Sequence, residues 1–165
     1  MSEKSAVEDE KHYTRAPKLL GDFGEGLVTY TLIRKGYEVA NVDHVGADLI
    51  AVKGTRRFAV SVKTRMYKKG SKETRGSVIA TDHIKKLDDF AKRFGLESIF
   101  AHAVCIADDK IIHLFMLNVA NLAKLDKVDH GHRLRFSPKH LQKTVDLPFI
   151  DYSCWSEENI GTNEF

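Results

Sequence analysis

The pattern of hydrophobic and polar positions divides the chain into helical and extended stretches. Residues 18–35 carry apolar side chains at three- and four-residue steps, which is typical of an amphipathic helix that ends before Gly36. Residues 81–94 repeat this spacing and end before Gly95. Both stretches are therefore predicted to be helices that pack through one face. The apolar positions of the first are Leu20, Phe23, Leu27 and Tyr30.

Five further stretches have the short apolar or alternating pattern of β-strands. They are residues 37–42, 48–53, 57–64, 98–107 and 110–117. Gly54 and Thr55 form a tight turn, so the second and third strands are predicted to pair as a hairpin. Residues 98–107 are apolar almost throughout, as expected of a strand covered on both faces. The element order α-β-β-β-α-β-β predicts an α/β fold.

The two ends of the chain are harder to interpret. Residues 1–17 lack periodicity and finish at Pro17, so we expect a flexible N-terminal arm before the core of residues 18–117. Residues 118–165 are predicted to be an appendage on the same domain. Within it we expect a helix near residues 118–126, a strand near 132–137 and a short helix that starts at Pro138.

Composition indicates a single globular domain. The 165 residues are 42% hydrophobic and 30% charged, which is typical of a folded chain with a core. No apolar run approaches the roughly 20 residues of a membrane helix, and the N-terminus lacks the apolar segment of a signal peptide, so we expect a cytoplasmic protein that does not bind membranes. Cys105 and Cys154 do not have a metal-binding spacing.

The net charge of +3 is less informative than its distribution. The stretch from Arg56 to Lys72 contains no acidic residue, and it leads into a polar loop, residues 66–77, that we expect to be mobile. Clustered cations of this kind bind phosphates without reading sequence. The residues expected to contact nucleic acid are Arg65, Lys68, Lys69, Lys72 and Arg75.

A carboxylate and a lysine are brought together by the predicted hairpin. Asp48 begins its first strand, and Lys63 lies near the end of its second. Because side chains alternate between the two faces of a strand, Ser61 and Lys63 share one face while Val60 and Val62 share the other. The head of one strand lies beside the tail of its antiparallel neighbour, so Asp48 and Lys63 are expected to be neighbours.

Glu25, in the first predicted helix, offers a second carboxylate. Hydrolysis of a phosphodiester requires carboxylates that hold a divalent metal, and a cation near the attacking water. Hard oxygen ligands suit Mg²⁺ or Mn²⁺. We expect Asp48, Glu25 and a backbone carbonyl near Val62 to bind the metal, and Lys63 to orient the water or stabilise the developing charge.

Two glycines, Gly24 and Gly26, flank Glu25. Each weakens a helix by about 1 kcal/mol relative to alanine, so their presence there requires a reason. One reason is close packing of the helix on the sheet. The other is close approach of a phosphate or a backbone to Glu25.

Four pieces of this sequence, in this order, resemble the PD-(D/E)xK nuclease superfamily, and most of all its archaeal-type Holliday junction resolvases and restriction-endonuclease-like proteins. They are Gly24-Glu25, Gly36-Tyr37, residues 46–50 (GADLI) and residues 60–65 (VSVKTR). The resemblance covers residues 18–117. It implies a restriction-endonuclease-like central mixed sheet flanked by helices, with an α-β-β-β-α-β core.

The resemblance also implies roles. Glu25 matches the helix glutamate of the family, Asp48 its metal-binding aspartate and Lys63 its catalytic lysine. The implied activity is a metal-dependent cut in DNA. A homodimer on branched DNA follows as a possibility, with an apolar strand at the sheet edge pairing across the two-fold axis.

One position departs from the family pattern. Ser61 stands two residues before the lysine, where the family carries Glu or Asp. Either a substitute carboxylate serves, for which Asp43, Glu73 and Asp82 are candidates, or the serine acts through a water. Alternatively, the site binds nucleic acid and no longer cuts it.

The remaining candidates are histidines. His83, at the start of the second predicted helix, either faces the site, as a polar residue does in relatives, or lies on the helix surface. His113 alternates with apolar residues on a strand and is expected to be structural. His130 and His132 form an H-x-H pair, which by itself is weak support for a metal site. A third hypothesis is an interaction protein in which the hairpin is coincidental.

Overall fold

The computed structural model describes residues 3–68 and 76–156, with side chains from residue 15 onward. Its α-helices are α1 (Glu3–Arg34), α2 (Thr81–Phe94) and α3 (Pro138–Val145), and its 3₁₀ helices are η2 (Ala107–Asp109) and η3 (Val119–Lys124). Its strands are β1 (Glu38–His44), β2 (Ala47–Lys53), β3 (Arg56–Tyr67), β4 (Ser77–Ala80), β5 (Glu97–Ile106), β6 (Ile111–Asn118), β7 (Asp126–Val128), β8 (Gly131–Leu134) and β9 (Ile150–Ser156). None of the helices described is long and apolar enough to cross a membrane.

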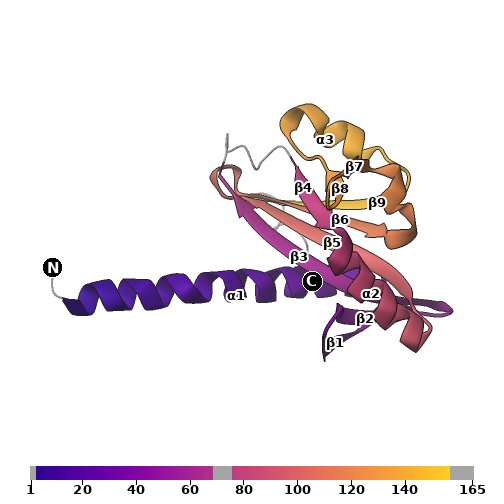
Figure 1. Cartoon of the computed structure of the whole chain (residues 1–165), viewed down its shortest axis with the longest axis horizontal. Helices are drawn as coiled ribbons and strands as arrows, with labels where there is room; N and C mark the ends of the chain where they lie inside the picture. The colour runs from indigo at the N-terminus through magenta and orange to yellow at the C-terminus, as the bar shows by residue number, and fades with distance from the viewer. Residues whose placement is uncertain (1–2, 69–75, 157–165) are drawn as a thin grey trace.

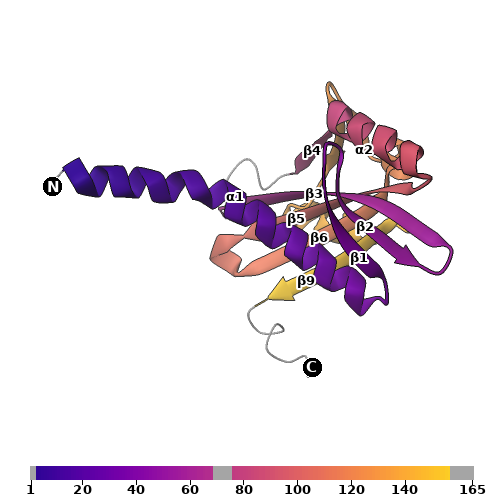
Figure 2. The ribbon, with the colours of Figure 1, turned by 90° about the horizontal axis from the view of Figure 1, so that it is seen from below.

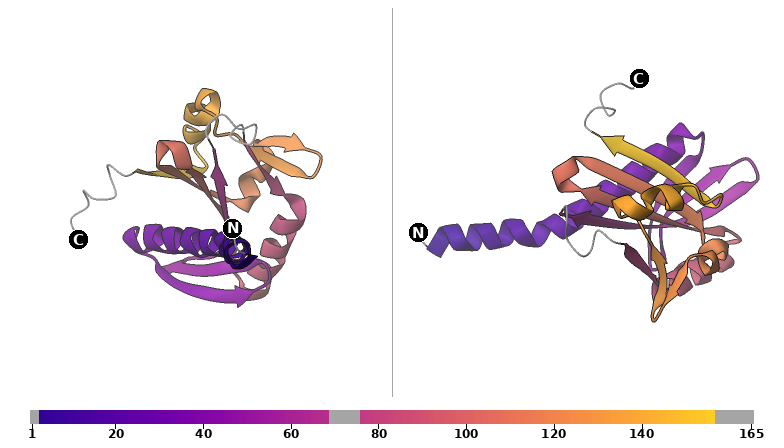
Figure 3. Two further views of the ribbon diagram at one scale, coloured as in Figure 1. Left: turned by 90° about the vertical axis from the view of Figure 1, so that its left-hand side faces the viewer. Right: turned by 90° about the horizontal axis from the view of Figure 1, so that it is seen from above.

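A mixed six-stranded sheet in the order β1-β2-β3-β5-β6-β9 forms the centre of the molecule. The β3–β5 pair is parallel, and the other neighbours are antiparallel. α1 covers one face, while α2, α3 and a small sheet of order β4-β8-β7 lie on the other (Figures 1 and 3). The predicted mixed sheet flanked by helices is confirmed.

Side chains of β3 alternate between the two faces of the main sheet and contribute to the hydrophobic core on each face. Val60 packs with Val28 of α1 on one face, and Ala59 packs with Leu87 and Phe90 of α2 on the other. The predicted division of β3 into two faces is therefore confirmed. It leaves Ser61 and Lys63 on the face that α2 covers.

α1 begins at Glu3, so the prediction that residues 1–17 precede the helix is wrong for the residues described. Pro17 lies inside the helix. A proline removes one backbone hydrogen bond and costs about 3 kcal/mol within a helix, but it does not prevent the helix from continuing. The N-terminal half of α1 extends beyond the sheet (Figures 1 and 2).

The face of α1 that contacts the sheet also differs from the prediction. Val28 and Leu32 are buried, together with Gly24 and Thr31, whereas Phe23 is 47% exposed. The large apolar residues therefore mark a stripe displaced from the true contact. A glycine and a threonine make part of this contact, and neither registers as hydrophobic.

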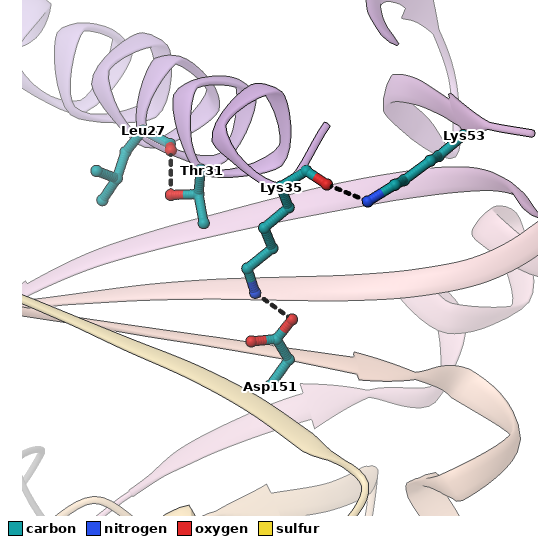
Figure 4. Close-up of polar contacts among 5 residues, drawn as sticks. All are labelled: Leu27, Thr31, Lys35, Lys53 and Asp151. Carbon is teal, nitrogen blue, oxygen red and sulfur yellow. Dashed lines mark hydrogen bonds and ion pairs between the residues drawn. The ribbon is translucent and has the colours of Figure 1, made fainter. Parts of the chain in front are cut away.

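The C-terminal end of α1 is fixed by three polar contacts, drawn in Figure 4. Thr31 Oγ1 donates to the Leu27 carbonyl at 2.8 Å. Lys53 Nζ donates to the Lys35 carbonyl at 2.6 Å, which places a cation at the negative end of the helix dipole. Lys35 in turn forms an ion pair with Asp151 at the start of β9. The contacts of Lys35 with Lys53 and Asp151 connect the end of α1 to β2 and β9 and so help to position the helix on the sheet.

β9 is a strand that the sequence pattern did not predict. It pairs with β6 from Ile111↔Ser156 to Leu117↔Ile150, so the C-terminal region contributes to the main sheet. The strand predicted at residues 110–117 is therefore covered by β9, and the edges of the main sheet are β1 and β9. The helix expected near residues 118–126 is the shorter η3, while α3 begins at Pro138 as predicted.

The small sheet connects α2 to this C-terminal region. β4 runs directly into α2 and pairs with β8 through Ile79↔His132 and Ala80↔Gly131. The Thr81 N–H donates to the His130 carbonyl at 3.0 Å. The first turn of α2 is thereby held against the small sheet.

Candidate active site

Asp48 joins β2 to β3 through its side chain. The paired register of these strands ends at Leu49↔Val60. Beyond it, Oδ2 of Asp48 accepts a hydrogen bond from the Val62 N–H at 2.6 Å and another from Ser61 Oγ at 3.2 Å. A carboxylate therefore takes the place of a backbone carbonyl at the point where the two strands separate.

The Val62 carbonyl lies on the same side of β3 as Asp48. In a strand, the N–H and the C=O of one residue point the same way, because both serve the same opposite residue of an antiparallel pair. Since the Val62 N–H points to Asp48, its carbonyl does so too. The predicted carbonyl ligand and the predicted carboxylate ligand are brought together.

His83 faces this site, so the surface alternative for this residue is wrong. Its Nε2 lies 2.8 Å from Ser61 Oγ, whose proton is directed to Asp48. His83 Nε2 is therefore the donor, and a chain of hydrogen bonds runs from His83 through Ser61 to Asp48. Partial burial lowers the pKa of His83, and the charge of Lys63 lowers it further.

Lys63 is partly buried on the same face of β3. This burial lowers the pKa of its ammonium group, and the positive charge of Arg65 adds to the effect. The Lys63 backbone carbonyl is held by His102 of β5, whose Nδ1 lies 2.8 Å away. Because a carbonyl only accepts, Nδ1 carries the proton of that ring.

His102 is a supporting residue that the sequence reasoning missed. It is 1% exposed, and its burial lowers the pKa of the ring to about 4. Its sequence signal was a single histidine inside the apolar stretch of residues 98–107. The parallel register Lys63↔His102, which fixes its role, cannot be read from the sequence.

Glu25 is positioned by the close contact of α1 with β3. Gly24 is buried against Thr64 of β3, so the next residue of the helix is brought to the end of the hairpin. Partial burial raises the pKa of Glu25, and the negative charge of Asp48 raises it further. Two carboxylates that repel each other in this way would both be stabilised by a cation between them.

These donors fit a hard divalent cation. Mg²⁺ in proteins is commonly held by one or two carboxylates, with waters and substrate phosphates completing its shell. Asp48 and Glu25 supply two carboxylates, and Oδ1 of Asp48 accepts no hydrogen bond from any residue described. A cluster of three or more His, Cys, Asp or Glu that could hold a metal does not occur within residues 15–68 and 76–156.

The proposed substitutes for the missing carboxylate do not join the site as far as the structure describes them. Asp43 and Asp82 are exposed on β1 and at the start of α2, and neither belongs to a metal-binding group. Glu73 lies outside the described residues. Two residues before Lys63, Ser61 forms a hydrogen-bonded pair with His83.

The predicted phosphate contacts are only partly described. Arg65 and Lys68 are exposed at the end of β3, and Arg65 Nη1 donates to the Thr64 carbonyl at 3.2 Å. The other predicted contacts, Lys69, Lys72 and Arg75, lie outside the described residues. Of the other histidines, His113 is buried with its Nδ1 2.8 Å from the Tyr152 hydroxyl, which confirms its structural role.

Comparison with known proteins supports the fold. No family model and no curated protein matches the sequence. Among solved structures, the chain is similar to Hjc, a Holliday junction resolvase from the archaeal hyperthermophile Archaeoglobus fulgidus, with a TM-score of 0.53 and 20% sequence identity. The similarity covers 70% of this chain and 83% of the resolvase. The fold is therefore similar to that of this resolvase.

Proposed function

We propose that this protein is a metal-dependent DNA endonuclease that acts on branched DNA. One observation carries the proposal: the Asp48 carboxylate is bonded to Val62, the residue before Lys63, and its charge raises the pKa of Glu25. This arrangement brings two carboxylates and a backbone carbonyl to the part of β3 that carries Lys63, and carboxylates that hold a metal with a nearby amine are what phosphodiester hydrolysis requires.

The residues of the chain would divide the work as follows. Asp48, Glu25 and the Val62 carbonyl hold Mg²⁺ or Mn²⁺, which when bound polarises the phosphoryl oxygen and activates a water. The chain His83–Ser61 donates to Oδ2 of Asp48, which would leave Oδ1 to bind the metal. Ser61 thus acts by orienting Asp48.

Lys63 would orient the attacking water and stabilise the charge that develops on the phosphoryl group. Its lowered pKa means that it releases a proton more readily than an exposed lysine. The bond from His102 to the Lys63 carbonyl holds the strand backbone from which this amine projects. His102 is therefore a positioning residue.

Branched DNA is proposed as substrate because the similar solved structure is that of a Holliday junction resolvase. Arg65 and Lys68, with Lys69, Lys72 and Arg75, would contact the phosphates of its arms. Two copies of the chain acting together would cut symmetry-related strands of a junction. The cytoplasmic location expected from the sequence is consistent with a DNA substrate.

A second candidate function is binding of nucleic acid without cleavage. It is favoured by Ser61, because a hydroxyl is a weaker ligand than a carboxylate for a hard cation. In that case the hydrogen bonds from His83 to Asp48 would be a structural network that has replaced a metal site. The two candidates make different predictions for bound DNA: with added metal, a nuclease would cut it and a binding protein would leave it intact.

The test is cleavage of a labelled four-way junction and a linear duplex with MgCl₂, MnCl₂ or EDTA. We expect cutting that requires metal, prefers the junction and is lost in Asp48→Asn and Lys63→Ala. Asp43→Asn, at an exposed aspartate on β1, is the matched control and should cut normally. DNA that is bound but left intact with every metal, equally by parent and variants, would overturn the nuclease in favour of the second candidate.

A further inference from the structure

A basic pocket lies on the small sheet and α3, away from the candidate active site. Its volume is about 500 Å³, and its walls come from η3, β7, β8 and α3. Four Lys or Arg side chains line it against one carboxylate. The charged and titratable residues of the lining are Lys124, Asp126, Arg133, Arg135, His140 and Lys143.

The topology explains why these cations converge. Arg133 lies opposite Asp126 in the β7–β8 pair, and Arg135 follows two residues later on the same side of the chain. Across from them, His140 and Lys143 are three residues apart on α3 and share one face of that helix. The outward face of the small sheet and one face of α3 thus point their basic groups into the same space. The helix and the sheet lie together on the side of the molecule opposite α1 (Figures 1 and 3).

The pKa of Asp126 shows the effect of these positive charges. Its carboxylate accepts a hydrogen bond from Arg135 Nε at 2.6 Å, and that bond and the charge of Arg135 lower its pKa. Lys143 and Arg133 lower the pKa of the same carboxyl group through their charges. One carboxylate therefore feels three cations, but it is bonded to Arg135 alone.

Two of these cations have no partner among the residues described. Arg133 and Lys143 have neither an ion pair nor a side-chain hydrogen bond with any part of the chain in ranges 15–68 and 76–156. Arg133 is only partly exposed, and it lines the pocket. A concave site with excess positive charge and unused donors is suited to a polyanion.

We propose that this pocket is a second nucleic-acid contact that binds the phosphate backbone of DNA beyond the cutting site. The inference rests on the proposed function for the identity of the polyanion. Its place in the fold is suitable, because β8 pairs with β4, which leads directly into the turn of α2 that carries His83. The region of residues 118–149 would then serve to hold an arm of the substrate.

The test compares charge changes inside and outside the pocket. Arg133→Gln/Lys143→Gln removes both cations, and Lys127→Gln/Lys139→Gln makes the same change on exposed residues of β7 and α3 that do not line it. Binding of a labelled junction and a labelled duplex is measured in EDTA at several salt concentrations. Circular dichroism confirms that each variant is folded, and Arg133→Lys/Lys143→Arg keeps the charge as a rescue.

For the pocket pair we expect weaker binding to all sequences. The slope of log K against log salt should become shallower by about 1.8, since each phosphate that is no longer neutralised removes about 0.9. The control pair and the rescue should bind like the parent.

The possible outcomes separate this inference from the proposed function. Normal binding by the pocket pair, while the parent binds and cuts DNA, would overturn this inference alone. A parent that does not bind DNA would overturn both the inference and the proposed function. Binding that depends on the pocket, without cleavage, would support the pocket and refute the nuclease.

Discussion

Gly24 should be far less replaceable than Gly26, although both lie in α1 next to Glu25. A Cβ at position 24 would lie 1.8 Å from Thr64 Oγ1 and 2.9 Å from Thr64 Cβ. A Cβ at position 26 would meet nothing within 4 Å. The two substitutions to alanine therefore make the same change in the helix and differ only in contact with β3.

The magnitudes follow from two opposing contributions. Alanine is favoured over glycine in a helix by about 1 kcal/mol, so Gly26→Ala should raise the free energy of unfolding by about that amount. At Gly24 the same gain is opposed by overpacking, which costs about 1–3 kcal/mol. The upper value applies because Thr64 is 7% exposed, stiff at χ1 and fixed in a central strand. Gly24→Ala should therefore lower the free energy of unfolding by about 2 kcal/mol.

Urea unfolding followed by circular dichroism measures both variants. In thermal melts, Gly24→Ala should lower Tm by about 4–8 °C and Gly26→Ala should raise it by about 2–4 °C. Thr64→Ala completes a double-mutant cycle with Gly24→Ala. The Thr64 hydroxyl is buried without a hydrogen bond, and its removal makes room for the new methyl group. In the double variant, most of the loss should be recovered. Equal stability of Gly24→Ala and Gly26→Ala would show that α1 does not lie this close to β3.

Three further predictions concern the surroundings of the site. In the folded protein the pKa of His102 is about 4, below the roughly 6.5 of an unfolded histidine. Its contribution to the free energy of unfolding is therefore complete above pH 6.5 and is lost as pH falls toward 4. Between pH 7 and pH 4.5, urea unfolding should show a decrease in the free energy of unfolding that approaches about 3 kcal/mol from this group, and His102→Gln should lack this decrease. Gly46→Ala should destabilise the fold by at least about 1–2 kcal/mol, because φ is +111° and a Cβ would lie 2.4 Å from the Lys86 carbonyl; an unchanged melting curve would contradict this. Ser61→Asp should lower stability without metal and increase the rise of Tm with MgCl₂, since it adds a carboxylate beside Asp48; a magnesium response no larger than the parent's would refute the placing of the cation.

The hairpin that carries the site could be predicted because its geometry is local. Asp48 and Lys63 lie on strands joined by a tight turn, and alternation alone fixed the face of Lys63. The end of α2 was equally readable, since Gly95 adopts the left-handed conformation that ends a helix. In each case a short-range rule decided the outcome.

Contacts between distant segments could not be predicted in the same way. Buried and exposed side chains alternate only weakly along β9, so its sequence does not predict a strand. The strand forms through its pairing with the distant β6. The role of His102 depends on the parallel register between β3 and β5. The sequence pattern places the start of α1 too late because Pro17 has the character of a helix boundary, although the helix continues through it.

The bond between Asp48 and Val62 also gives the protein an intrinsic spectroscopic reporter. The Val62 amide donates to a carboxylate and not to a peptide carbonyl, and short bonds to charged acceptors are stronger than ordinary ladder bonds. Its proton resonance should therefore lie downfield of those of neighbouring strand amides and should move when the charge beside Asp48 changes. One backbone signal would then report the arrival of a cation at the Asp48 carboxylate, without any added label.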